Sequence, residues 1–152
     1  MSLWIIGIGN SQRRDDGIGP FVAERLRQIF WGRRDIHIRA QQALDPVLLE
    51  DLKDAVRVVF VDATARRLSA GWIWTLVEPR GGSGPFEAHD LQAPALLALL
   101  QTWYNRRPDA WMVAIQGENF DIGEGLSPEA RHRAVRLVEE IADLAGNGNI
   151  EC

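Results

Sequence analysis

Apolar and polar positions alternate with two different periods along the chain, and this predicts strands and helices in turn. Leu3 to Ile8 is an uncharged apolar run, which is typical of a strand covered on both faces. From Gly17 to Phe30, apolar residues recur at helical spacing with charged residues between them. This second segment is therefore expected to form an amphipathic helix directly after a buried strand.

The rest of the chain continues the alternation without a repeat, a low-complexity tract or a linker. Further strands are predicted at 36–39, 56–61, 71–77 and 111–115. Further helices are predicted at 47–52, 94–104 and from Ser127-Pro128 to Gly146. We therefore predict one domain over residues 1–152 with an α/β fold, a three-layer sandwich whose five-stranded, mostly parallel, twisted sheet has helices on both faces.

The charge balance and the cysteine content of the chain exclude several classes of binding partner and site. The 152 residues include 17 Lys and Arg against 21 Asp and Glu, a net charge of −4, which disfavours a general nucleic-acid or membrane-surface binder. No apolar run reaches the roughly 18 residues of a bilayer span, and no secretory signal is recognisable. Cys152 is the single cysteine, so a disulfide framework and a Cys-ligated zinc site are excluded. We expect a cytoplasmic monomer with a protein or small-molecule partner.

The glycine-rich segment GIGNSQRRDDGIG resembles a dinucleotide-binding turn only in part. Gly7 and Gly9 fit the first two glycines of GxGxxG, but Gln12 occupies the third position. Asp15 and Asp16 then stand where the helix N-terminus would receive a phosphate, and their charge would repel it. Motifs for serine or cysteine nucleophiles are also missing from the chain.

Three side chains remain as a candidate site. Asp16 follows the first strand, Asp62 is expected to end the second buried strand, and His89 follows the fourth strand on a long loop. In an open α/β sheet, ligands bind outside the carboxyl ends of the strands, so these residues are expected to meet there. Two carboxylates and an imidazole form a ligand set that suits zinc, nickel or iron and leaves coordination positions open.

Each candidate also has a structural interpretation. Asp15 is expected to cap the first helix or complement its dipole, so that its replacement by Asn costs about 1 kcal/mol. The same role is open for Asp16, and His89 taken alone is an ordinary loop histidine. Asp62 is the least easily explained by packing, because an apolar strand gains nothing from an acid at its tip.

Four segments resemble the [NiFe]-hydrogenase maturation endopeptidases over nearly the whole chain. They are the opening GIGNSQRRDDGIGP, VVFVDA at Val58 to Ala63, the histidine of AHDLQAPALLALL, and GENFDIGEGLSPEA at Gly117 to Ala130. The resemblance implies a three-layer α/β hydrolase that removes a C-terminal extension from the hydrogenase large-subunit precursor after nickel insertion. It also implies that Asp16, Asp62 and His89 contact nickel supplied by the precursor, with zinc or cadmium as possible substitutes in crystals.

Two other functions stay open at this stage. A non-catalytic, nickel-sensing assembly chaperone would use the same three ligands to dock on the same precursor without cutting it. A nucleoside- or phosphate-binding hydrolase would instead need a basic crevice around Gly9, whereas the chain places acids there.

Overall fold

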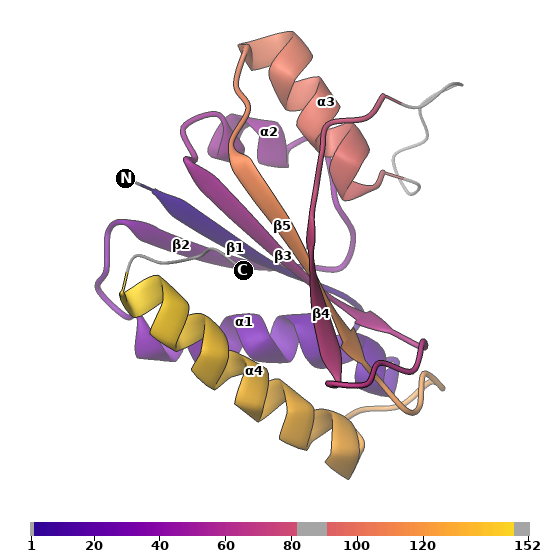
Figure 1. The fold of residues 1–152 in the computed structure, drawn as a ribbon. Helices are drawn as coiled ribbons and strands as arrows, with labels where there is room; N and C mark the ends of the chain where they lie inside the picture. Colours follow the sequence, from indigo (N-terminus) through magenta and orange to yellow (C-terminus); the bar gives the residue numbers. More distant parts are fainter. Residues whose placement is uncertain (1, 82–90, 148–152) are drawn as a thin grey trace.

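The computed structural model describes residues 2–81 and 91–147, and its elements follow the predicted order (Figure 1). The strands are β1 (Leu3–Ile8), β2 (Ile36–Gln41), β3 (Arg57–Thr64), β4 (Trp72–Leu76) and β5 (Asp109–Gln116). The helices are the short 3-10 turn η1 (Arg14–Gly17), α1 (Ile18–Ile29), α2 (Leu48–Leu52), α3 (Ala93–Tyr104) and α4 (Pro128–Gly146).

The five strands form one sheet in the order β2-β1-β3-β5-β4. β1, β2, β3 and β5 run parallel, and β4 pairs antiparallel with β5 at one edge. The predicted α/β fold with a mostly parallel five-stranded sheet is thus confirmed.

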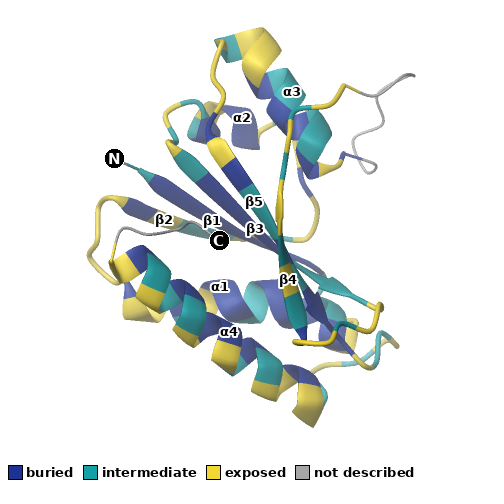
Figure 2. Ribbon diagram, in the orientation of Figure 1, coloured by how far each residue is buried: buried dark blue, intermediate teal, exposed yellow. Residues whose placement is uncertain are grey.

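Helices cover the sheet on both faces and bury two separate cores (Figures 1 and 2). On one face, Ile5 and Val59 pack with apolar residues of α1 and α4. On the other face, Ile6 and Phe60 pack with apolar residues of α2 and α3. Because the central strands contribute to both cores, they are apolar at consecutive positions. No helix within residues 2–81 and 91–147 is long and apolar enough to cross a membrane.

The strand order reverses between β1 and β3. From β1 the chain crosses to β2 on one side, and it then returns past β1 to β3 on the other side. Such a reversal leaves a crevice at the carboxyl ends of the two strands, because their connections leave in opposite directions. The register pairs Ile8, the last residue of β1, with Asp62 of β3. The fold therefore places Asp62 at this reversal.

α1 lies unusually close to the strands beneath it. A Cβ atom added at Gly19 of α1 would lie 2.2 Å from the carbonyl oxygen of Ile8 and 2.7 Å from that of Val61. One added at Gly7 of β1 would lie 2.1 Å from the carbonyl oxygen of Gly19. Glycine at both positions allows the backbones to touch, which holds the start of α1 against the ends of β1 and β3.

Candidate functional site

Asp62 lies within β3, two residues before the strand ends. Sequence reasoning placed the strand end at Asp62, but the strand continues because Ala63 and Thr64 pair with Ile115 and Gln116 of β5. The side chain is partly buried. Burial and the negative charge of Asp16 raise the pKa of Asp62 to about 6, although a hydrogen bond with the Ala63 backbone opposes the shift. A carboxyl group in this setting is stabilised by a proton or by a cation.

Asp16 belongs to η1, the turn between β1 and α1. Its Oδ2 accepts a hydrogen bond of 2.8 Å from the backbone N–H of Asn10, so the carboxylate is turned back toward the end of β1. It does not cap α1, whose N-cap residue is Gly17 with no side-chain cap bond. The capping interpretation of Asp16 is therefore wrong. The same bond occupies the Asn10 N–H that a phosphate-binding turn would offer to its ligand, which disfavours the phosphate alternative.

The two carboxylates form a negatively charged pair at the reversal of strand order. Within residues 2–81 and 91–147, neither Asp16 nor Asp62 has an ion pair with a Lys, Arg or His side chain. After burial, the charge of Asp16 is the second cause of the raised pKa of Asp62, which is consistent with two carboxylates within electrostatic range of each other. Paired oxygens of this kind can hold a divalent cation or take a proton from a water molecule.

His89, the third predicted ligand, lies outside the described residues. Among the described residues alone, no group of three or more His, Cys, Asp or Glu side chains could hold a metal ion. The described part of the site therefore consists of two acids, and a complete metal site needs a further ligand from elsewhere.

The sequence suggested that Asp15 caps the first helix, and this expectation is wrong. Asp15 instead holds a loop that is distant in the sequence. The residue is fully buried, and its carboxylate accepts four hydrogen bonds. The donors are the backbone N–H groups of Glu118, Asn119 and Ser127 and the Ser127 hydroxyl, at 2.7 to 3.0 Å. Burial alone would raise the pKa of Asp15, but these hydrogen bonds together lower it below its ordinary value.

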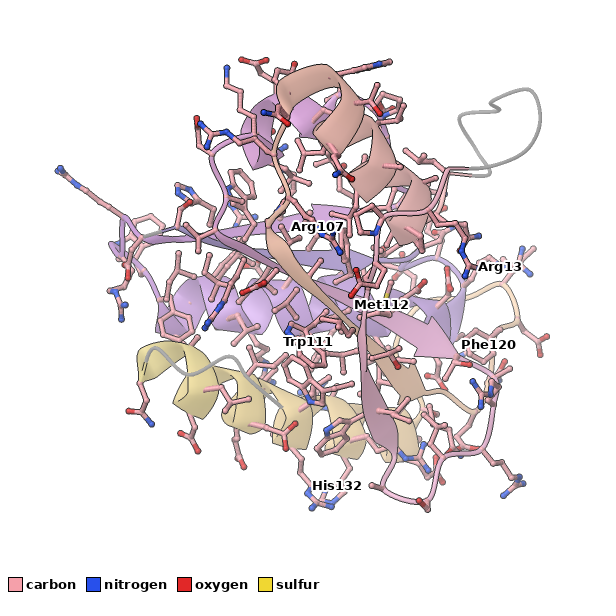
Figure 3. The ribbon with its side chains drawn as sticks, turned by 45° about the horizontal axis from the view of Figure 1, so that its top comes forward. Arg13, Arg107, Trp111, Met112, Phe120 and His132 are labelled. Atoms are coloured by element: carbon pink, nitrogen blue, oxygen red, sulfur yellow. The ribbon has the colours of Figure 1, made fainter. Side chains whose placement is uncertain are left out.

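Backbone contacts fasten the same loop, residues 117–127, to the turn after β1. The Asp15 N–H donates to the Asn119 carbonyl, the Arg14 N–H donates to the Gly123 carbonyl, and the Gly123 N–H donates to the Gln12 carbonyl. Figure 3 shows Arg13 and Phe120, one from each segment, on the same side of the molecule. The loop that follows β5 thus supports the turn that carries Asp16.

Sequence reasoning missed this arrangement because no local pattern links residue 15 to residues more than a hundred positions later. The glycines of the run GENFDIGEGLS indicate a loop before the last helix, but they do not show which residue that loop contacts. Ser127 is also the N-cap residue of α4, because its hydroxyl oxygen accepts a hydrogen bond from the Ala130 N–H. Ser127 therefore serves the helix and the buried carboxylate together.

A stability prediction follows from the raised pKa of Asp62. Between about pH 4 and pH 6 the folded protein binds a proton at Asp62 that the unfolded chain does not, so this residue destabilises the fold as pH rises through that window. In metal-free buffer, Asp62→Asn should raise the free energy of unfolding at pH 7 by about 1 to 2 kcal/mol, allowing for partial exposure. Urea titrations at pH 7 and below pH 4 measure the difference.

The gain should disappear below pH 4, because the wild-type carboxyl group is then neutral in both states. Asp54→Asn, at an exposed acid far from the site, is the control and should shift the free energy of unfolding by less than about 0.5 kcal/mol. An Asp62→Asn protein that is no more stable than the wild type at pH 7 would contradict the prediction.

The chain is similar to known proteins in its structure. No protein-family model and no curated protein matches the sequence. Among solved structures, the [NiFe] hydrogenase maturation protease HycI from Thermococcus kodakarensis is 26% identical, with a TM-score of 0.73 over 94% of this chain and 91% of that one. The hydrogenase maturating endopeptidase HybD from E. coli is 19% identical, with a TM-score of 0.75 over 97% of this chain and 94% of that one.

A third structure, the hydrogenase 2 maturation peptidase from a Thaumarchaeota archaeon, is 18% identical with a TM-score of 0.68, over 96% of this chain and 99% of its own. The chain thus shares the α/β fold of these named peptidases over nearly its whole length. The resemblance to the [NiFe]-hydrogenase maturation protease family that the sequence indicated is confirmed.

Proposed function

We propose that this chain is an endopeptidase that removes the C-terminal extension of a [NiFe]-hydrogenase large-subunit precursor after nickel insertion. The observation that carries the proposal is the pair Asp16 and Asp62 at the strand-order reversal of a fold shared with named maturation proteases. This pair belongs to the opening and VDA segments on which the sequence resemblance rests. The two acids are partly buried and have no ion pair with a described basic residue. Such a pair is suited to bind a metal cation.

The nickel ion is treated as part of the substrate and not as a resident cofactor. Asp16, Asp62 and His89 are the residues proposed to contact it, and their oxygen and nitrogen donors suit nickel, with zinc or cadmium as substitutes. An ion bound there would polarise the scissile carbonyl or lower the pKa of a water molecule toward 7. Two protein acids and one imidazole leave coordination positions for the precursor's own ligands.

The protein's own side chains then have distinct roles in the proposed reaction. Asp16 is oriented by the Asn10 N–H, so one of its oxygens is held and the other is left for the ligand. Burial and the charge of Asp16 raise the pKa of Asp62 to about 6, so its carboxyl group can give up or take a proton at mildly acidic pH before the substrate docks. Hydrolysis of the amide bond consumes one water molecule and releases the new carboxylate and the amine of the extension.

The function is tested by incubating the protein with nickel-loaded precursor and measuring the intact mass of the product. We expect one cleavage near the precursor's C-terminus. Asp16→Asn, Asp62→Asn and His89→Ala should each lower the cleavage rate at least about a hundredfold, the scale of losing a group that positions or transfers a proton. Full activity in any two of these variants would remove the proposed site.

Asp54→Asn is the matched control, because it also removes a carboxylate but lies on the surface far from the strand-order reversal. It should cleave at the wild-type rate. A wild-type protein that binds the nickel-loaded precursor and leaves its mass unchanged would favour the assembly chaperone over the peptidase.

A further inference from the structure

β2 is an edge strand of the sheet, and among residues 2–81 and 91–147 it pairs only with β1. Its outer side therefore carries backbone groups that no described strand pairs with. The Leu3 N–H donates to the Asp35 carbonyl and the Gly9 N–H to the Gln41 carbonyl, which fixes which residues of β2 face β1. Since backbone direction alternates along a strand, the N–H and C=O groups of Ile36, Ile38 and Ala40 point away from the sheet.

Two hollows lie along this edge, one after the other. The first, of about 300 Å³, is lined by Ile36 to Arg39 of β2 and by Trp4, Phe30 and Trp31. The second, of about 330 Å³, is lined by Ala40 to Gln42 and by residues 9–12. Because the two hollows lie along β2, one added strand would pass both of them. In such a strand every second side chain points to the same side and could enter a hollow.

The second hollow borders the turn after β1, close to the residue that holds Asp16. Asn10 is part of its wall, and the backbone N–H of Asn10 holds the carboxylate of Asp16. A chain that follows β2 to its end at Gln41 therefore arrives beside the residue that positions Asp16. This continuity distinguishes the β2 edge from the β4 edge at the other side of the sheet (Figure 1).

The first hollow has an unusually exposed aromatic side chain at its wall. Trp31 is 89% exposed, although a tryptophan gains stability from burial. Trp4 also lines this hollow, with the centre of the His37 ring stacked 4.7 Å from its own and the Arg39 guanidinium 5.3 Å from its ring centre. Tryptophan and arginine are the residue types that contribute most often to protein binding energy.

We infer that an extended segment of the precursor binds by adding a sixth strand to the β2 edge. Backbone hydrogen bonds with Ile36, Ile38 and Ala40 would hold the segment, and the two hollows would receive its alternate side chains. The inference rests on the proposed function, because it identifies the precursor as the occupant and places the scissile bond beside Asp16.

The test removes one outward-facing N–H from the edge. Ala40→Pro deletes that donor while leaving the bonds between β2 and β1, and proline is tolerated on edge strands. We expect the affinity for nickel-loaded precursor, measured by biolayer interferometry, to fall at least about tenfold. Leu76→Pro is the matched control, since antiparallel pairing with β5 makes the Leu76 N–H point outward on the opposite edge. It should bind the precursor within about twofold of wild type.

Equal affinity of Ala40→Pro and wild type would overturn strand addition, and so would an equal loss in both proline variants. If Ala40→Pro does not fold, amide exchange of the wild-type protein decides the matter. The N–H groups of Ile36, Ile38 and Ala40 should gain protection when precursor is added, and unchanged exchange there would overturn the inference.

The two proposals fail in different ways. Strand addition fails while the peptidase stands if Ala40→Pro cleaves the precursor with wild-type kcat/KM. The peptidase fails while strand addition stands if wild type binds the precursor through these amides and leaves it uncut. Trp31→Ala, at an exposed side chain, should raise KM more than it lowers kcat.

Discussion

Replacing Asp15 by Asn is expected to lower the free energy of unfolding by about 3 kcal/mol, well above the 1 kcal/mol of a lost helix cap. The carboxylate is buried and accepts hydrogen bonds from three backbone N–H groups and one hydroxyl. An Asn amide has one accepting oxygen, and its NH₂ group must then face at least one buried N–H. That donor is left without a partner, and the remaining bonds lose their ionic character.

Urea unfolding at pH 7 measures this loss, and Asp121→Asn is the matched control. Asp121 lies in the same loop but is exposed, so its replacement should change the free energy of unfolding by less than about 0.5 kcal/mol. Because the folded pKa of Asp15 lies below the ordinary 3.8, its stabilisation is present above about pH 4 and declines as pH falls further. A loss near 1 kcal/mol at pH 7 would restore the capping interpretation.

Gly19→Ala is expected to cost about 3 kcal/mol of stability or more, although alanine is the better helix former. The new Cβ atom would lie 2.2 Å from the Ile8 carbonyl oxygen, 2.6 Å from the Ile8 nitrogen and 2.7 Å from the Val61 carbonyl oxygen. All three are backbone atoms of central strands, so the clash is relieved only by moving α1 away from the sheet. The gain in helix propensity, about 1 kcal/mol, does not offset that movement.

Thermal and urea unfolding of Gly19→Ala, compared with Gly146→Ala, measure the effect. A Cβ atom at Gly146, near the end of α4, would meet nothing within 4 Å, so that variant should match or slightly exceed the wild-type stability. Equal stability of the two variants would show that α1 is not held at the distance described. Because α1 follows the turn carrying Asp16, the Gly19→Ala protein should also cleave precursor more slowly.

Most of the fold could be predicted from the sequence because its signals are local. The uncharged run Leu3 to Ile8 is β1 itself, and the helical pattern over 17–30 is α1 with one residue less at each end. β5 was predicted at 111–115 but spans Asp109–Gln116. Its extra residues form a strand through pairing with β3, and a partner strand leaves no mark on the sequence of β5.

The candidate site could be predicted where it follows from topology. Parallel strands end at the same edge, so Asp16 and Asp62 were expected there together, and the structure places them at that edge. The role of Asp15 could not be predicted, since the choice between a cap and a buried anchor depends on a loop that follows β5. Adjacent aspartates in one turn thus point to different parts of the molecule.

The tie between Asp15 and the loop 117–127 has a consequence for engineering. Asp16, the acid proposed to take part in catalysis, directly follows Asp15, which binds the loop 117–127. The position of Asp16 therefore depends on a segment about a hundred residues later in the chain. Grafting that segment from a relative would alter the reactive geometry without touching the crevice, unless the graft also brings the three amides and the hydroxyl that grip the buried carboxylate.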